Sequence, residues 1–173
     1  MYTFRIHGRG GHGVELASRV LGRACFLSGF YVQDFTLWKQ EPRIAPITSY
    51  VKTDKTPILS KELTEPDFLL VLDKTLLTDI KDVRKGIAMF NAPERFGGIK
   101  KKDVKNYYLN ATDIGLSTMM KPLPNTAMLG GLCKIFEKIS LRTMKKAAEI
   151  EIRQNQKENL AAVDEGFKNV KRM

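Results

Sequence analysis

The feature that most constrains this sequence is a glycine-rich segment near its beginning, G-R-G-G-H-G at residues 8–13. Before it, residues 2–7 alternate polar and apolar side chains, which predicts a strand with one buried face. After it, residues 14–28 have apolar side chains at helical spacing, and Gly29 follows where a helix C-terminus favours glycine. The sequence therefore predicts that the chain opens with a strand–turn–helix unit.

The rest of the chain alternates extended and helical patterns and then becomes helical. Extended patterns lie at 30–37, 47–52, 57–59, 68–72, 86–90 and 107–109. Helical patterns lie at 75–80, 125–139, from Ser140 onward, and at 160–170. The run at 68–72 has no polar face, which is typical of a central strand covered on both sides. We therefore expect an α/β fold, a three-layer α/β/α arrangement with a mostly parallel sheet and C-terminal helices. A length of 173 residues suits a single domain over 1–173.

Composition excludes several classes of protein. Hydrophobic residues make up 43% and charged residues 28%, as in globular chains that bury a core. No apolar run approaches the roughly 20 residues of a membrane-spanning helix, and the first residues lack the apolar region of a secretory signal. Cys25 and Cys133 lie in apolar stretches and are expected to be buried free thiols. We expect a cytoplasmic protein that has no metal site of its own, because no Cys or His pair has ligand spacing.

The net charge of +10 favours anionic partners. The only dense basic run is Lys100–Lys102, and such a short run is usually a solvated loop or a helix start. The aromatic residues lie mostly in apolar runs and not among the basic ones, which disfavours nucleic-acid binding as the second alternative function.

The glycine segment satisfies the pattern G-x-G-x-x-G between a strand and a helix. Glycines let backbone amides approach a ligand, and a helix N-terminus attracts negative charge, so the pattern favours an anion such as phosphate. Asp34, near the end of the next expected strand, leaves open an NAD(P)-binding oxidoreductase domain as the first alternative. The extra Gly11, the bulky Arg9 and His12, and the half-polar first strand count against that alternative. A turn needed only for packing also stays open.

Four segments in order resemble one known family. They are R-I-H-G-R-G-G-H-G-V at 5–14, E-P-R-I-A-P at 41–46, E-P-D at 65–67 before a strand that ends at Asp73, and N-T-A-M-L-G at 125–130. Together they resemble the gamma subunit of 2-oxoacid:ferredoxin oxidoreductases, across nearly the whole chain. This sequence has His12 where that family usually has Gln, and Ile44 where it has Gly.

The resemblance implies an activity for a complex rather than for this chain alone. Such enzymes decarboxylate a 2-oxoacid, most commonly pyruvate, on thiamine diphosphate with magnesium. They pass electrons through iron–sulfur clusters to ferredoxin and form an acyl-coenzyme A. The cofactors belong to the alpha, beta and ferredoxin-like delta subunits. The gamma subunit is expected to bind no cofactor alone, to complete the complex, and to cover the active site or help bind coenzyme A.

The resemblance and the glycine pattern together select the candidate binding residues, and no catalytic residue is expected in this chain. The candidates are Gly8, Arg9, Gly10, Gly11, His12, Gly13, Arg43 and Asn125. The alternative role of Asn125 is to cap the helix that follows it. If the loop binds coenzyme A, Arg9→Ala should raise the Michaelis constant for coenzyme A.

A subunit of a complex should also expose apolar surface for its partners. The candidate surfaces are the segment 35–38, which includes Trp38, and the pair Met119 and Met120. We therefore expect the isolated chain to self-associate.

Overall fold

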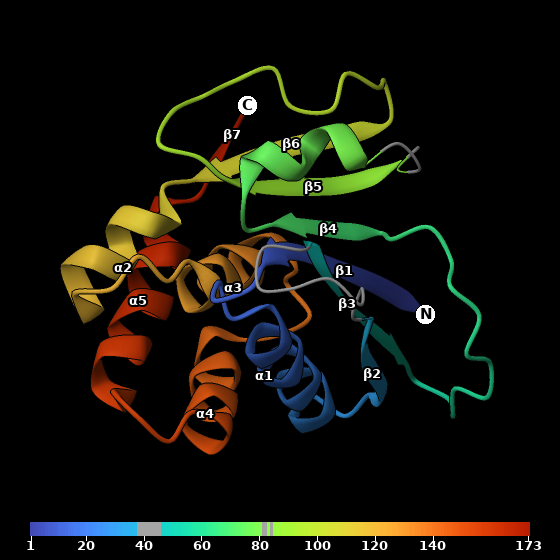
Figure 1. The fold of residues 1–173 in the computed structure, drawn as a ribbon. Helices are drawn as coiled ribbons and strands as arrows, with labels where there is room; N and C mark the ends of the chain where they lie inside the picture. Colours follow the sequence, from blue (N-terminus) through green and yellow to red (C-terminus); the bar gives the residue numbers. More distant parts are fainter. Residues whose placement is uncertain (38–45, 81–82, 84) are drawn as a thin grey trace.

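A seven-stranded sheet in the order β2-β3-β1-β4-β5-β6-β7 runs through the protein (Figure 1). The structure, a computed structural model, describes residues 1–37, 46–80, 83 and 85–173. The strands are β1 (Tyr2–Arg9), β2 (Tyr31–Leu37), β3 (Pro46–Asp54), β4 (Phe68–Val71), β5 (Gly86–Asn91), β6 (Val104–Leu109) and β7 (Lys171–Arg172). The two prolines and mixed charges at 38–46 predict a loop, which lies, except for Pro46, outside the described residues.

The four central strands are parallel, and the strands at both edges are antiparallel. β1 pairs with β4, β4 with β5, and β5 with β6, each in parallel. β3 pairs with β1, β2 with β3, and β7 with β6, each antiparallel. The expected α/β fold with a mostly parallel sheet is therefore confirmed for the centre of the sheet.

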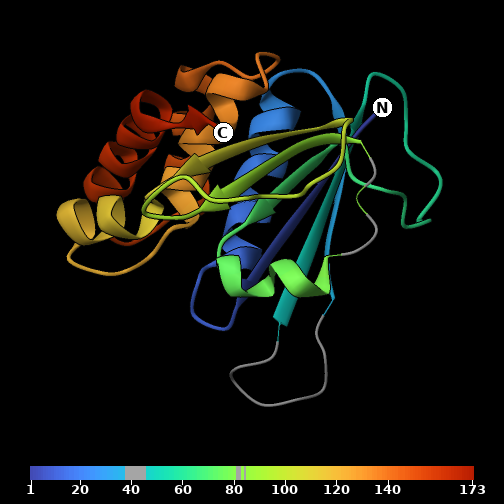
Figure 2. The same ribbon diagram turned by 90° about the horizontal axis from the view of Figure 1, so that it is seen from above.

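The five α-helices of the described residues gather on one face of the sheet, as the edge-on view in Figure 2 shows. They are α1 (Val14–Leu27), α2 (Ala111–Met119), α3 (Asn125–Ile135), α4 (Leu141–Glu151) and α5 (Gln156–Asn169). The opposite face of β4, β5 and β6 is covered by the 3-10 helix η1 (Lys74–Asp79) and by the segment 96–99. The third layer of the domain is thus thin and contains no α-helix among the described residues.

The apolar run of β4 divides its side chains between two cores. Phe68 and Leu70 belong to the large core under the α-helices. Leu69 and Val71 belong to the smaller core under η1. This strand is covered on both sides, as its lack of a polar face predicted.

An aromatic cluster fastens the helix layer to the centre of the sheet. The Phe4 and Phe68 rings stack with centroids 4.9 Å apart, and Phe136 lies edge-on to both, at 5.1 and 5.0 Å. Such arrangements stabilise by about 0.5–1.5 kcal/mol per pair beyond simple burial. The cluster joins β1 and β4 to the end of α3, and so fixes how α3 lies across the sheet.

The first helix begins where the sequence predicted and ends one residue earlier than predicted. α1 starts at Val14 after Gly13, whose φ is 72°, and ends at Leu27 before Ser28 and Gly29, whose φ is 78°. Glycine populates the left-handed region without the steric penalty of a Cβ, so both ends of α1 are encoded locally.

Some expected elements differ from the structure. Residues 57–59 form no strand, α3 ends at Ile135 rather than near 139, and η1 is a 3-10 helix. Helix α2 and the short β7 were not expected. The signal for α2 is Asn110, whose side chain accepts a hydrogen bond from the Asp113 N–H at 3.3 Å, as a helix N-cap does.

Both cysteines are buried free thiols, as expected. Burial raises the pKa of Cys25 to about 12 and that of Cys133 to about 11, so neither forms a thiolate at neutral pH. Among the helices of the described residues, none combines the length and apolarity needed to cross a membrane.

Two exposed positions allow backbone strain to be measured. Met120 has φ 53° at the end of α2 and is 89% exposed, whereas a Cβ at Gly29 would meet open space. We expect Met120→Gly to stabilise the protein by up to about 1 kcal/mol, and Gly29→Ala to destabilise it by about 1 kcal/mol. Urea unfolding measures both free energies, and equal stability of all three proteins would contradict the strain.

Candidate functional site

The glycine loop lies at the carboxyl end of β1, where the sheet changes direction. From β1 the chain passes through α1 to β2 and β3 on one side, and then to β4 on the other side of β1. In open α/β sheets, ligands bind outside the carboxyl ends of the strands at such a switch point. The topology therefore places the loop where a ligand site is expected.

The loop depends on glycine at particular positions. A Cβ at Gly8 would lie 2.5 Å from Val14 Cγ2, and Gly11 has φ 88°. The His12 N–H donates to the Arg9 carbonyl at 3.1 Å, which closes the turn. The Arg9 N–H in turn approaches His12 Nδ1 at 3.5 Å. The His12 ring is therefore held over the start of the turn.

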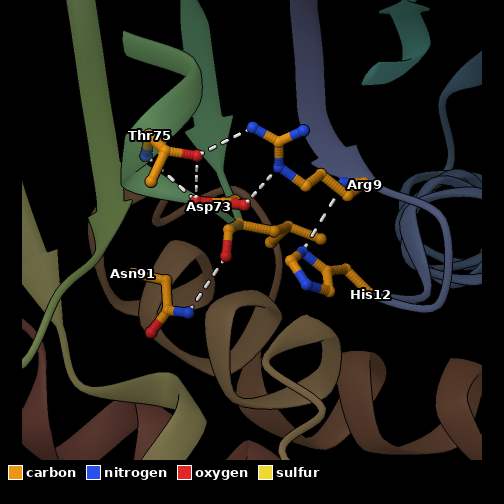
Figure 3. A network of polar contacts seen from close by, with 6 residues as sticks. Arg9, His12, Asp73, Thr75 and Asn91 are labelled. Carbon is orange, nitrogen blue, oxygen red and sulfur yellow. Dashed lines mark hydrogen bonds and ion pairs between the residues drawn. The ribbon is translucent and has the colours of Figure 1, made fainter. Parts of the chain in front are cut away.

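Arg9 fastens the loop to η1 (Figure 3). Its Nε donates to Asp73 Oδ2 at 2.8 Å, and one Nη donates to the Thr75 hydroxyl at 3.0 Å. Asp73 Oδ1 accepts from the Thr75 N–H at 2.9 Å and so caps η1. The pairing with Asp73 neutralises much of the charge of Arg9. The contacts of Arg9 therefore connect the glycine loop to η1.

The environment of Asp73 stabilises its charged form. Burial raises the pKa of Asp73, but the hydrogen bonds from Thr75 and Arg9 outweigh burial and hold that pKa below its usual value. The bridge between the loop and η1 therefore persists at neutral pH.

Asn91 joins the ends of two strands beside this bridge. Its Nδ2 donates to the Leu72 carbonyl at 3.0 Å and to the Thr112 hydroxyl at 2.8 Å, and its Oδ1 accepts from the Thr112 N–H at 3.2 Å. Next to it a crevice of about 400 Å³ opens. Its lining includes His12, Asp73, Lys74, Thr75, Asn91, Asn110 and Thr112.

Asn125 lies directly against the glycine loop. A Cβ at Gly13 would collide with the Asn125 amide, so this glycine permits the contact. Asn125 is the first residue of α3, and the N-cap is Pro124, so the expected capping role is wrong. The residue is 3% exposed, and its Oδ1 has no hydrogen-bond partner among the described residues. The fold thus brings two candidates together that are separated by more than a hundred residues in sequence.

Other candidates are placed differently. Arg43, Ile44 and Trp38 lie outside the described residues. Met120 is exposed as expected, whereas Met119 is 8% exposed and packs in the core. The pair at the end of α2 therefore offers one apolar side chain at the surface and not two.

Asp34 does not occupy the position that the NAD(P) alternative requires. β3 lies between β1 and β2, and Asp34 is opposite Val51, which is opposite Phe4. Asp34 is therefore level with the first half of β1, whereas the glycine loop follows its last residue. A dinucleotide fold needs the acidic residue on a parallel neighbour of the first strand, at the carboxyl edge.

Sequence reasoning missed Thr75, Asn91 and the fastening role of Asp73. A signal exists for the first, since D-x-T after a buried strand is typical of a capped helical turn. The Asn91 bonds depend on α2, which was not expected, so nothing in the local sequence indicates them.

These observations define an α/β domain with a glycine-rich loop at the switch point of its sheet, closed by the N-terminus of a distant helix. A model of the family described as pyruvate ferredoxin/flavodoxin oxidoreductase matches residues 3–169. The chain belongs to this family. The resemblance to gamma subunits of 2-oxoacid:ferredoxin oxidoreductases is confirmed, and the chain is a subunit of an enzyme of this kind.

Similar proteins cover nearly the whole chain. It is 37% identical to the pyruvate/ketoisovalerate oxidoreductases common subunit gamma of Pyrococcus furiosus, over 85% of this chain and 84% of that protein. It is 34% identical to the pyruvate synthase subunit PorC of Methanothermobacter thermautotrophicus, over 84% and 82%. The crystal structure of the pyruvate oxidoreductase subunit PORC of Thermotoga maritima aligns with a TM-score of 0.84 and 29% identity, over 98% and 97%. Neither alternative function receives support from these similarities.

The effect of the Gly13–Asn125 contact on stability can be separated from the effect of backbone strain. Gly11→Ala meets only an unfavourable φ, whereas Gly13→Ala meets an unfavourable φ and the Asn125 amide. We expect Gly13→Ala to destabilise the protein by at least about 1 kcal/mol more than Gly11→Ala in urea unfolding. In an Asn125→Ala background, which removes the amide but keeps a Cβ at 3.2 Å, the difference between the two penalties should shrink. Equal penalties in the parent protein would contradict the close approach.

The Arg9–Asp73 bridge predicts a pH dependence of stability. Because the native pKa of Asp73 is lowered, its contribution is complete above the unfolded value of about 3.9 and is lost as pH falls through the native value. We expect Asp73→Asn to lower the free energy of unfolding by about 1–2 kcal/mol near pH 6. The difference from the parent protein should shrink in acid. A difference that is constant down to pH 2 would contradict this assignment.

Proposed function

We propose that this chain is the gamma subunit of an enzyme that converts a 2-oxoacid, pyruvate in the first instance, into an acyl-coenzyme A and passes the electrons to ferredoxin. In that complex it completes the assembly and helps to bind coenzyme A at the glycine loop and Asn125. The names of its relatives support pyruvate as the substrate. The partners proposed are alpha, beta and ferredoxin-like delta subunits, and the compartment proposed is the cytoplasm.

One observation supports the coenzyme A role above all others. The N-termini of α1 and α3 meet where Gly13 contacts Asn125, and neither helix has a side-chain cap. Each helix N-terminus contributes free N–H groups and about half a positive charge. Two such ends side by side favour an anion more strongly than one. The phosphate groups of coenzyme A are anions of this kind.

The chain's own residues would bind and orient rather than react. Thiamine diphosphate, magnesium and iron–sulfur clusters, which supply the decarboxylation and electron transfer, are proposed to belong to the other subunits. Backbone N–H groups of the glycine loop would contact the coenzyme, and Asn125 would hold a polar group of it. Arg9 would act indirectly, because its bridge to Asp73 fixes the loop in place.

Asn125→Asp in the assembled enzyme tests this proposal. A carboxylate at two helix N-termini would oppose an anionic ligand without removing the side chain's volume. We expect the Michaelis constant for coenzyme A to rise about tenfold or more, equivalent to about 1.4 kcal/mol, with little change in that for pyruvate. Initial rates of acyl-coenzyme A formation measure both constants.

The matched control is Asn169→Asp, which makes the same change of charge at an exposed position at the end of α5. Asn125→Ala is a second variant that introduces no charge, and it should raise the same constant less. A rise confined to pyruvate would assign the site to the 2-oxoacid instead. An unchanged constant for coenzyme A in both Asn125 variants would remove the coenzyme from this site.

A further inference from the structure

A second concave site lies on the helix side of Asn125, away from the crevice at the strand ends. It is a cleft of about 450 Å³ between α1, the α2–α3 connection and the α4–α5 connection. Its polar lining includes Arg19, Lys121, Asn125, Arg153, Asn155 and Asn159. None of these except Asn125 belongs to the candidate residues of the glycine loop.

Two helices begin at this cleft. α3 begins at Asn125, and α5 begins at Gln156, directly after Asn155. Neither N-cap residue makes a side-chain hydrogen bond to its helix. The first turn of α3 has no acidic residue, and that of α5 has Glu158, which is outside the cleft lining. Their N-terminal N–H groups and partial positive charges therefore favour an anion in the cleft.

The charged side chains of the lining also favour an anion. Lys121 and Arg153 form no ion pair among the described residues, and both are exposed. The one acid in the lining is Glu151. Its Oε1 accepts from Arg23 at 2.9 Å and its Oε2 from Arg19 at 3.1 Å, so both of its oxygens are already satisfied. The cleft therefore has a net positive charge.

An unpaired acceptor in the lining is an independent observation that favours a ligand with a hydrogen-bond donor. Asn125 is only 3% exposed, and its Oδ1 is buried. No described residue donates a hydrogen bond to this oxygen. Leaving a buried acceptor unpaired is costly, so native proteins satisfy nearly all of them. Asn159 does not fill this need, because its Nδ2 donates to the Asn155 carbonyl at 2.8 Å and to the Gln154 carbonyl at 3.4 Å. A hydroxyl or N–H of a ligand in the cleft would pair this oxygen.

Apart from Gln154, the rest of the lining is apolar. Leu16, Leu123 and Ile152 line the cleft between the charged groups, and the volume exceeds that of a bare ion many times over. The backbone is also unusual at its rim. Two non-glycine residues of the described chain have positive φ, Met120 and Asn155. Asn155 lines the cleft, and Met120 lies in sequence between two lining residues, Met119 and Lys121. Such conformations gather at functional sites.

We propose that this cleft binds a small organic phosphate of about the size of a nucleoside monophosphate. The phosphate would lie between Arg153, Lys121 and the helix N-termini, and a hydroxyl would donate to Asn125 Oδ1. The carbon skeleton would cover the apolar lining. This proposal does not depend on acyl-coenzyme A formation, since it concerns binding to the full chain in the absence of turnover.

Isothermal titration of the full chain tests it, with AMP and ribose 5-phosphate as probes and with adenosine and inorganic phosphate as comparison compounds. We expect saturable binding of at least one organic phosphate, weaker binding of inorganic phosphate, and none of adenosine. Arg153→Glu and Lys121→Glu should each weaken the binding at least tenfold. The matched control is Arg142→Glu, which makes the same change of charge near the start of α4 and outside the cleft lining.

Several results would overturn the site. They are the absence of binding by both probes, equal binding of AMP and adenosine, or equal losses in Arg153→Glu and Arg142→Glu. Equal affinity for inorganic phosphate would overturn the role of Asn125 Oδ1 as acceptor. Thermal unfolding of each variant shows whether it is folded, and Lys121→Glu gives the answer if Arg153→Glu is not. The coenzyme A test reads a Michaelis constant in the assembled enzyme, so the two proposals can fail separately.

Discussion

The close approach of Asn125 to Gly13 is the contact on which the arrangement of this site depends. It requires a residue without a Cβ at the start of α1 and places the N-terminus of α3 against the glycine loop. The Phe4–Phe68–Phe136 cluster holds the other end of α3 against the sheet. With both ends fixed, α3 cannot shift along the sheet without losing one of these contacts. The position of the site is therefore a consequence of packing as much as of the glycine motif.

Electrostatics then divides the surroundings of α3 into two regions. At the strand ends, Arg9 is paired with Asp73, and Asn91 is fully used by backbone and Thr112. On the helix side, Arg153 and Lys121 are exposed beside two helix N-termini. Polar groups that are mutually satisfied hold structure in place, whereas groups that leave an acceptor unpaired point to a ligand. This contrast explains why Arg9, the charged residue of the motif, holds the glycine loop against η1.

The sequence predicted what is encoded over short distances. The boundaries of α1 followed from Gly13 and Gly29, and the two-sided burial of β4 followed from its unbroken apolar run. The antiparallel insertion of β3 between β1 and β2 could not be predicted, because strand order depends on pairings between distant residues. That insertion also places Asp34 level with the first half of β1, whereas its spacing in the sequence had indicated a position near a ribose. Asn125 was recognised by motif, but its place inside α3 depends on Pro124 and the preceding turn.

The same reasoning explains how one glycine motif serves different chemistries. In a dinucleotide fold the first strand is buried on both faces and its parallel neighbour supplies an acidic residue. Here β1 is also largely buried, but it has the polar Arg5 and His7 on the face opposite Phe4 and Ile6, and its neighbour β3 is antiparallel. The side of the loop that would face a ribose is therefore built differently. In the proposed coenzyme A site, the preference of the loop for an anion comes from α3, which supplies a second N-terminus and the Asn125 amide.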